Sequence, residues 1–275
     1  MNLENYFISQ FKSANIGDDG AFIDGMVYSK DAFFENIHFK TSWMSHYQIG
    51  YKSIMVNISD AVAMNATPKY ALLSVAMPKD ITKSQMRDLA KGFQDACAKY
   101  GVDIIGGDTI SNIKLDITVT IVSKSNKPLM RKGLKRGDLI AYSGTLGKSA
   151  KELKKLMNLG KIHKNSKFVN IFLRDKFIYN NRRFLRVGMD ISDGIFSDLQ
   201  KLSLASGVGF RFYKKIQKRV GCSGEEYEML FGFDRRFKKT LLRRAKLTKT
   251  PINIIAECVR KAYTNRCKSH HFNKN

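Results

Sequence analysis

The sequence predicts an α/β or α+β protein with two domains that meet near residue 135. Three observations support this class. Apolar stretches of strand length alternate with helical patterns in the first half of the chain. Hydrophobic residues make up 43% of the 275 residues, enough for a packed core. The stretch "KRGDLIAYSGTLG" (135–147) is typical of the entry into a second domain, so we expect α/β domains at 1–134 and 135–275.

The first elements follow from spacing and turn residues. "AFIDGMVYSKDAF" (21–33) indicates a hairpin with Asp-Gly as its turn. "YKSIMVNISDAVAMNA" (51–66) has helical spacing without an internal Gly or Pro, and "TPKYALLSVAMP" (67–78) indicates a strand that Pro78 closes.

The clearest helix is "TKSQMRDLAKGFQDACAKYG" (82–101), with Thr82 as its N-cap and Gly101 at its end. We expect strands in "VDIIGGDTI" (102–110) and "KLDITVTIVSK" (114–124), on either side of a Gly-rich loop. A later helix is expected in "SDGIFSDLQKLSLASG" (192–207), with Ser192 as its N-cap.

Composition limits the class of protein and its location. The start, "MNLENYFISQF", has an acid and no sustained apolar region, so no signal peptide is expected. Apolar runs such as "YALLSVAM" (70–77) are far too short to span a membrane. The cysteines form no CxxC pair and no disulfide framework, so we expect reduced thiols in a cytoplasm. They are Cys97, Cys222, Cys258 and Cys267.

The formal charge of +24 raises the question of nucleic-acid binding. No RRM, KH, zinc-finger or homeodomain signature accompanies the charge, and the basic residues are spread widely. We therefore expect Lys and Arg on solvated faces, with a weak and salt-sensitive affinity for polyanions and no specific nucleic-acid partner.

Two further motifs are incomplete. "GTLGKS" (144–149) would need Gly at 142 to be a P-loop, and the residue there is Tyr142, so we expect a tight turn before a helix. The tail has four residues of the types that bind zinc, but their spacing matches no standard structural site. These residues are Cys258, Cys267, His270 and His271.

Five stretches place the scarce acids among apolar or Gly-rich residues: "NIGDDGAF", "YSKDAFFENIHF", "VNISDAVAM", "DIIGGDTI" and "MDISDGIF". A single Asp of this kind is often a turn former or a helix cap. Caps do not require "DD", "GGD" or "DxSDG", whereas Mg²⁺ requires hard oxygen ligands and shares its shell with substrate phosphates. We therefore expect magnesium ions that hold a polyanionic substrate.

The order of motifs resembles that of the thiamine-monophosphate kinases, within the aminoimidazole-ribonucleotide-synthetase-like ATP-binding superfamily. One short block is a weak signal, but seven blocks in family order from Gly17 to Phe231 are a strong one. The blocks are "GDDGAF", "KDAFFENIHF", "VNISDAVAMNATP", "IIGGDT", "LMRKGLKRGDLI", "MDISDGIFSDL" and "GEEYEMLF". The His-Phe pair of the second block and "GEEYE" favour the thiamine kinase over its relatives.

The resemblance implies a role for each matching position. Mg²⁺ ligands are implied at Asp19, Ser29, Asp31, Asp60, Asp108, Asp190 and Asp193. ATP contacts are implied at Gly107, Asp108, Arg131 and Ser192, with catalytic roles for Asp108, Arg131 and Asp193. Contacts to thiamine monophosphate are implied at His38 and Glu225, and a role in supporting the loop at Asp18.

The chain departs from the family pattern at several positions. Lys30 stands where the family usually has Thr, Asn65 replaces a usual Gly, and Glu226 replaces an Asp. Fewer residues follow the last block than in typical members, so the C-terminal domain is expected to be shortened. The aromatic side chain that covers the thiamine ring is not assigned, and Tyr263 and Phe272 are its candidates.

The resemblance also implies the two-domain synthetase-like fold and a direct transfer of the γ-phosphoryl group of ATP onto thiamine monophosphate. A phosphate monoester is already a nucleophile near neutral pH, so no general base is needed. A homodimer that pairs through the N-terminal sheets is implied, with ATP near that interface. Two alternatives are another ATP-dependent enzyme of the superfamily, of the synthetase or selenophosphate type, and a weakened regulatory relative.

Overall fold

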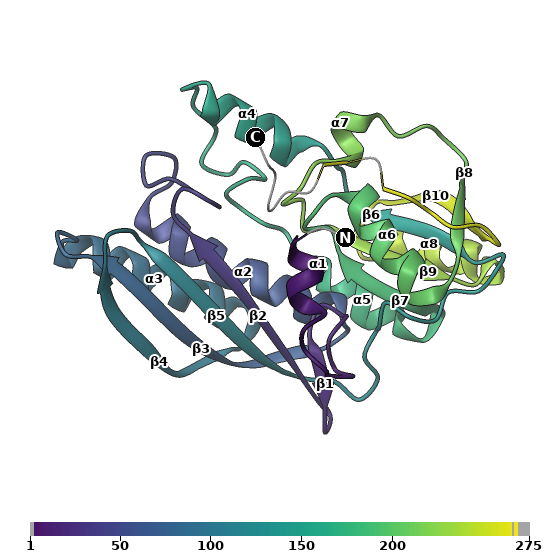
Figure 1. Cartoon of the computed structure of the whole chain (residues 1–275), viewed down its shortest axis with the longest axis horizontal. Coiled ribbons are helices and arrows are strands. Elements are labelled where there is room, and N and C mark those ends of the chain that lie inside the picture. Colours follow the sequence, from purple (N-terminus) through teal and green to yellow (C-terminus); the bar gives the residue numbers. More distant parts are fainter. Residues whose placement is uncertain (1–2, 266, 269–275) are drawn as a thin grey trace. The chain divides into compact units, whose positions relative to one another are not determined.

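The computed structural model describes residues 3–265, 267 and 268 (Figure 1). The chain folds into two compact units, each built from more than one stretch of sequence. The Asp60 unit comprises residues 19–128 and 152–175, and the Asp190 unit comprises the rest of the described chain. The predicted mixed α/β class is confirmed, with one sheet in each unit. The division at residue 135 stays a prediction.

The Asp60 unit is a five-stranded sheet with two long helices on one face (Figure 1). The strand order is β1-β2-β5-β3-β4; β3 and β4 are parallel and the other neighbours are antiparallel. The strands are β1 Ala21–Ile23, β2 Met26–Phe34, β3 Thr67–Pro78, β4 Asp103–Asn112 and β5 Asp116–Lys124, and the helices are α2 His46–Ala63 and α3 Lys83–Tyr100.

Only one face of this sheet packs on helices within the unit. From Asp116 to Ser123 of β5, half-buried and buried side chains alternate, as expected for a sheet with one covered face. We call the other side the open face, defined by Tyr28, Tyr70 and Leu72, which are 39–42% exposed. Tyr28 and Tyr70 both pair with Val122 of β5, so the two rings flank one position of the sheet.

Several predicted elements of this unit are confirmed. The hairpin of β1 and β2 pairs Ile23 with Met26 around the Asp-Gly turn. Thr82 caps α3 through a reciprocal pair of hydrogen bonds with Gln85, and Gly101 ends the helix at φ 64°. Helix α2 begins earlier than predicted, because Ser45 forms a second such capping box.

One prediction in this unit needs correction. The two glycines at 106 and 107 lie inside β4 and not in a loop. The strand tolerates them because the β3–β4 register shifts between Ala71 and Leu72, which leaves Ile105 as an extra residue.

The Asp190 unit is built on the sheet β7-β9-β6-β10-β8 (Figure 1). Its strands are β6 Leu139–Ser143, β7 Leu185–Asp190, β8 Gly209–Phe212, β9 Met229–Phe233 and β10 Ile252–Val259. Its helices are α1 Leu3–Ile8, α6 Ile195–Ser206, α7 Lys218–Gly221 and α8 Lys238–Leu247, with 3-10 turns η1 Arg182–Phe184 and η2 Arg235–Phe237. Two more helices include residues of both units: α4 Lys148–Met157 and α5 Asp175–Asn181.

The core of the Asp190 unit lies between its sheet and α6. All five residues of β9 are buried. Leu199 and Leu202 of α6 belong to the same apolar cluster as Val187 of β7 and Leu230 of β9. Helix α6 begins after Gly194 (φ 91°), so the prediction that Ser192 is its N-cap is wrong.

The cysteines also differ from expectation. Cys222 and Cys267 form a disulfide, so the expectation of reduced thiols is wrong for this pair. A disulfide needs both side chains within reach, and 45 residues of sequence separate these two before folding brings their Cα atoms to 5.6 Å. Cys97 and Cys258 are free and buried. His270, His271 and Phe272 lie outside the described residues.

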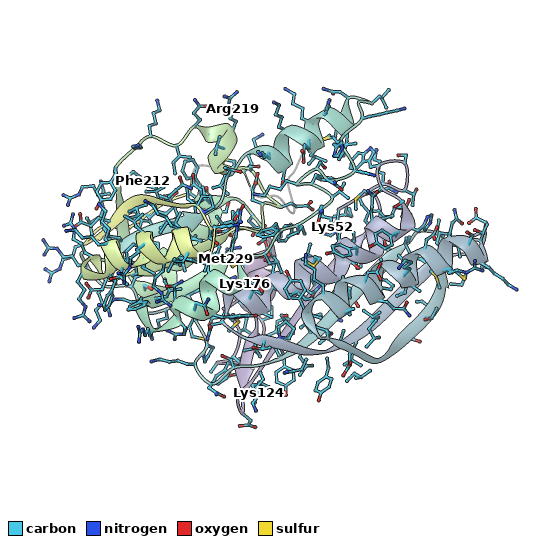
Figure 2. The ribbon with its side chains drawn as sticks, turned by 180° about the vertical axis from the view of Figure 1, so that it is seen from behind. Lys52, Lys124, Lys176, Phe212, Arg219 and Met229 are labelled. Atoms are coloured by element: carbon cyan, nitrogen blue, oxygen red, sulfur yellow. A yellow bond between two sulfur atoms is a disulfide. The ribbon has the colours of Figure 1, made fainter. Side chains whose placement is uncertain are left out.

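The basic residues of 214–219 are exposed, and Figure 2 shows Arg219 projecting from α7. This placement agrees with the expectation of charges on solvated faces. Among the helices formed by the described residues, none combines the length and the apolar character needed to cross a membrane.

Candidate active site

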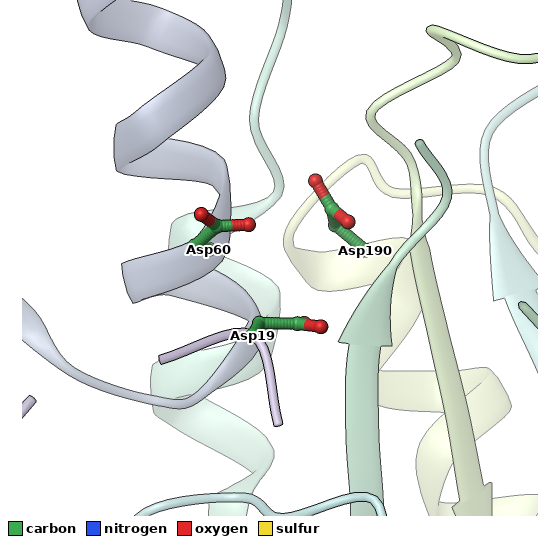
Figure 3. Close-up of side chains that lie close together, drawn as sticks. All are labelled: Asp19, Asp60 and Asp190. Atoms are coloured by element: carbon green, nitrogen blue, oxygen red, sulfur yellow. The ribbon is translucent and has the colours of Figure 1, made fainter. Parts of the chain in front are cut away.

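Two of the predicted metal ligands meet in the Asp60 unit. Asp60 lies in the last turn of α2, and Asp19 lies in the segment just before β1 (Figure 3). A carboxylate oxygen of Asp19 and one of Asp60 lie within 4.8 Å of each other, and both side chains are half-buried. The loop "GDDG" and the helix "NISD" are 41 residues apart, so only the fold brings these acids together.

Ser29 and Asp31 face α2 from the middle of β2. The Asp31 N–H donates to Asn57 Oδ1 at 2.8 Å, and the Ser29 hydroxyl donates to the Asn57 carbonyl at 3.4 Å. Asn57 precedes Asp60 by three residues on the same face of α2. The structure therefore places Asp31 on the side of the sheet that carries Asp60. Asn57 is a positioning residue that sequence reasoning missed, although "VNISD" contains it.

Asp108 lies apart from these acids within the unit. It is on β4, at the edge of the sheet, and β5 and β3 separate β4 from β2. Asp31 pairs with Val119, Val119 with Leu73, and Leu73 with Gly107, which forms one row across the sheet. Because side chains alternate between faces, Asp108 lies on the open face when Asp31 lies on the helix face.

Gly107 is required by close packing in the sheet. A Cβ atom there would lie 1.7 Å from the carbonyl oxygen of Leu73, and φ is 152°. Its neighbour Asp108 is exposed and accepts a hydrogen bond from the Thr109 N–H at 2.9 Å. Lys30, the departure from the family pattern, is also exposed; its ammonium donates to Thr118 and Thr120 at 3.2 and 3.4 Å.

His38 is oriented for donation from one nitrogen. Its Nδ1 accepts from the Phe34 N–H at 3.0 Å, and its ring stacks on Phe33 with centroids 5.7 Å apart. In a neutral imidazole one nitrogen accepts and the other carries the proton. The contact to Phe34 therefore assigns the proton to Nε2.

In the Asp190 unit, the predicted residues lie on two loops that are bonded to each other. Asp190 ends β7 and is 2% exposed (Figure 3). Ser192 follows it, and its carbonyl accepts from the Glu225 N–H at 2.7 Å. Glu225 is half-buried at φ 53°, a left-handed backbone that its neighbours impose. The blocks "DISDG" and "GEEYE" thus form one local structure.

Glu226 and Glu228 have structural partners in this unit, which separates them from Glu225. Glu226 is 1% exposed and accepts from the Gly147 N–H at 2.7 Å and the Ser223 hydroxyl at 2.6 Å. Glu228 is 3% exposed and accepts from Ser143 at 2.7 Å. The "GTLGKS" segment is therefore a turn held by Glu226, and it leads into α4 as predicted.

An ion-pair network that sequence reasoning missed surrounds Asp193. Lys201 of α6 donates to Asp193 Oδ2 at 2.6 Å and to Asp198 Oδ1 at 2.9 Å. The Asp198 side chain is fully buried, and burial raises its pKa to about 6. A signal was present, since Asp198 and Lys201 are three residues apart on a predicted helix.

Arg131 is held beside the first acidic loop. Its N–H donates to Asp18 Oδ1 at 2.5 Å and its Nη1 to the Gly17 carbonyl at 3.1 Å. The Ser206 hydroxyl at the end of α6 donates to the Arg131 carbonyl at 3.1 Å. Asp18 thus supports the backbone, in line with the role expected of it.

The donor sets of both units suit a magnesium ion. Asp19 and Asp60 in one unit, and Asp190 and Asp193 in the other, are all carboxylates, which are hard oxygen donors. No thiolate or imidazole is among them, so a site for a soft metal is not favoured.

Comparisons with known proteins agree with this reading. Residues 17–124 match the family model described as "AIR synthase related protein, N-terminal domain". The chain is 31% identical over 223 residues to "Thiamine-monophosphate kinase" of Bacillus subtilis (strain 168), covering 73% of this chain and 67% of that protein. It is 30% identical over 220 residues to the protein of the same name from Nitrosopumilus maritimus (strain SCM1), covering 73% and 71%.

A solved structure described as "AaThiL complexed with AMPPCP and TMP" superposes with a TM-score of 0.84. The match covers 95% of this chain and 91% of the other, at 24% identity, which establishes a shared fold. With two relatives at 30% identity or more matched over two thirds of their length, the chain belongs to the thiamine-monophosphate kinase family and is an enzyme of that family.

Proposed function

We propose that this chain transfers the γ-phosphoryl group of ATP directly onto the phosphate of thiamine monophosphate, giving thiamine diphosphate. The observation that carries the proposal is the approach of Asp19 and Asp60, whose carboxylate oxygens lie within 4.8 Å in a chain of this family. The acceptor phosphate is largely a dianion at pH 7 and attacks without a general base. The obstacle is to bring one anion against another.

The implied metal ligands fall into two groups. Asp19, Asp31 and Asp60 would hold Mg²⁺ in the Asp60 unit, and Asp190 and Asp193 in the Asp190 unit. Ser29 would add an oxygen next to Asp31. When bound, the ions neutralise phosphate charge and stabilise an in-line transfer.

Two side chains are proposed to recognise the acceptor. His38 carries its proton on Nε2, so it can donate to a phosphate oxygen. Glu225 would meet the cationic thiazolium ring. From the sequence "GEEYE" alone, Glu226 or Glu228 could also contact the thiazolium ring. Both carboxylates are buried and accept structural hydrogen bonds, so neither can take over this role from Glu225.

The triphosphate would contact Gly107, Asp108, Arg131 and Ser192. A groove of about 350 Å³ lies along β4 beside Gly107 and Asp108, with apolar walls from Leu89 and Phe93 of α3. An apolar groove that ends in the exposed backbone around Gly107 suits a nucleotide, because the base is apolar on its faces and backbone N–H groups can approach a phosphate.

We propose further that the active protein is a homodimer whose metal site takes Asp108 from a second copy. In one chain Asp31 and Asp108 lie three strands apart, about 14 Å at ~4.8 Å per strand, and on opposite faces. Two ligands of one Mg²⁺ must bring their oxygens within about 4.2 Å of each other. The open face and the β4 edge offer the surface for such a partner.

Co-expression of Asp31→Asn and Asp108→Asn chains tests this arrangement. Each variant alone should be inactive. If Asp108 acts across the dimer, one of the two sites in each mixed dimer keeps both acids, so random mixing restores about a quarter of the wild-type activity. If both acids act within one chain, the mixture stays inactive.

The reaction itself is tested by ATP consumption with thiamine monophosphate, with the product identified by chromatography. We expect thiamine diphosphate and ADP in equal amounts, and a loss of at least about 100-fold in kcat for Asp108→Asn with an unchanged melting transition. His38→Ala and Glu225→Ala should raise the KM of the acceptor while ATP binding stays normal. His163→Ala, an exposed histidine, is the matched control. A different acceptor that gives faster turnover would overturn the substrate assignment.

A further inference from the structure

The ammonium of Lys201 lies in an unusual position, because it contacts Asp193, a proposed ligand of Mg²⁺. Its ammonium lies 2.6 Å from Asp193 Oδ2. Both side chains are about one-third exposed. None of the seven blocks that carry the family resemblance contains Lys201, which lies two residues beyond "SDGIFSDL".

A second carboxylate, that of Asp198, holds Lys201 in that position. Asp198, three residues earlier on α6, is fully buried and accepts from the same ammonium at 2.9 Å. Its other oxygen, Oδ2, has no hydrogen-bond partner within the described part of the chain. A buried carboxylate is stabilised by a cation, so Asp198 fixes Lys201 at the foot of the "DISDG" loop.

The charges around Lys201 make this contact strong. The ammonium lies between two carboxylates, 2.6 Å from Asp193 Oδ2 and 2.9 Å from Asp198 Oδ1. A lysine ammonium is charged at neutral pH, so both contacts are ion pairs.

We propose that Lys201 is a positioning residue that holds Asp193 in the metal-free protein and competes with Mg²⁺ for it. The ammonium lies on Asp193 Oδ2, and a Mg²⁺ ion bound to the same carboxylate would be close enough to repel it. Binding of the ion thus displaces Lys201 from Asp193 while Asp198 retains it. The contact orients Asp193 before the ion arrives and weakens the apparent affinity for metal. This inference rests on the proposed use of Asp193 as a metal ligand.

The test measures the binding of Mn²⁺ alone to the full chain, by electron paramagnetic resonance and without nucleotide. Lys201→Met keeps the length of the side chain and removes its charge, so Mn²⁺ should bind more tightly, on the order of tenfold. Lys201→Arg keeps the charge and should restore an affinity near that of the wild type. A merely structural role predicts the opposite sign, because disorder of the loop weakens metal binding.

Lys201→Met leaves Asp198 without its cation and could unfold the chain. The double variant Asp198→Asn/Lys201→Met removes both charges together and should also bind Mn²⁺ more tightly. Lys91→Met is the matched control for net charge, since Lys91 is exposed and pairs with Asp95 on α3 of the other unit. It should leave the affinity unchanged.

A double-mutant cycle with Asp193→Asn distinguishes a failure of the inference about Lys201 from a failure of the proposal that Asp193 is a metal ligand. If Asp193→Asn weakens Mn²⁺ binding and cancels the gain of Lys201→Met, the inference holds. If Asp193→Asn weakens binding but Lys201→Met does not strengthen it, the inference fails and the proposed ligand stands. If Asp193→Asn leaves Mn²⁺ binding unchanged, Asp193 is not a ligand and both fail.

Discussion

The two five-stranded sheets differ in how completely they are buried. In the Asp190 unit all of β9 is buried, and β6 and β7 each expose a single residue in part. In the Asp60 unit burial alternates along β5, and β4 is exposed along nine of its ten residues. Burial of a sheet on both sides contributes to the stability of the unit. A sheet with an open face and a free edge has surface that a partner can bind.

The largest expected difference concerns a single aromatic side chain in each sheet. Phe231→Ala in β9 removes a fully buried ring and should cost about 3–5 kcal/mol in the free energy of unfolding. Tyr70→Ala on the open face removes a ring that is 42% exposed and should cost less than about 1 kcal/mol. Urea denaturation of the isolated chains measures both. Equal losses would show that the open face is covered within one chain.

Neighbouring glycines in β4 offer a matched pair within one strand. Gly107→Ala places a Cβ against the Leu73 carbonyl and should cost about 2–4 kcal/mol, because backbone strain and overlap add. At Gly106 the backbone is similar, with φ 154°, but the nearest atom is Leu72 Cδ2 at 3.6 Å. Gly106→Ala should therefore cost about 1–3 kcal/mol, the strain alone. A reversed order in thermal melts would contradict this register.

Reduction of the disulfide measures its contribution to the stability of the Asp190 unit. Breaking Cys222–Cys267 frees a loop of 45 residues in the unfolded chain and should lower stability by about 4 kcal/mol. Thiol titration before reduction should detect almost no reactive cysteine. Burial raises the pKa of Cys97 to about 11 and that of Cys258 to about 12, so few thiolates form at pH 8. Rapid labelling of two thiols in the native, unreduced protein would contradict the structure.

The smallest expected effect on stability comes from a charge on the open face. Leu72→Lys should change the unfolding free energy of one chain by no more than about 0.5 kcal/mol, because Leu72 is 39% exposed. The same change should abolish the proposed dimer and its activity, since it buries a charge in an apolar contact. Sedimentation velocity distinguishes the two species. A stable dimer with this variant would exclude the open face as the interface.

Local elements were predictable because their signals are local. The hairpin of β1 and β2 follows from Asp-Gly between alternating residues, and α3 follows from Thr82, its apolar face and Gly101. The position of Gly106 and Gly107 inside β4 was not predictable, because glycine is as typical of a loop as of a strand with a register shift. The N-cap of α6 was misjudged by two residues for a related reason, since Ser192 and Gly194 both suit a cap.

The candidate site shows the same limit. The choice of Asp as the metal-ligating type came from residue chemistry and spacing, and the order of seven motifs identified the family. Which acids can share an ion came from folding alone: Asp19 and Asp60 approach each other, while Asp31 and Asp108 lie on opposite faces of a sheet. The contact of Glu226 with Gly147 depends on a neighbour that is distant in the chain. The contact of Lys201 with Asp193 depends on the direction of the two side chains. Residue type and short-range spacing are properties of the chain, whereas register, burial and the face on which a side chain lies exist only after distant strands have paired.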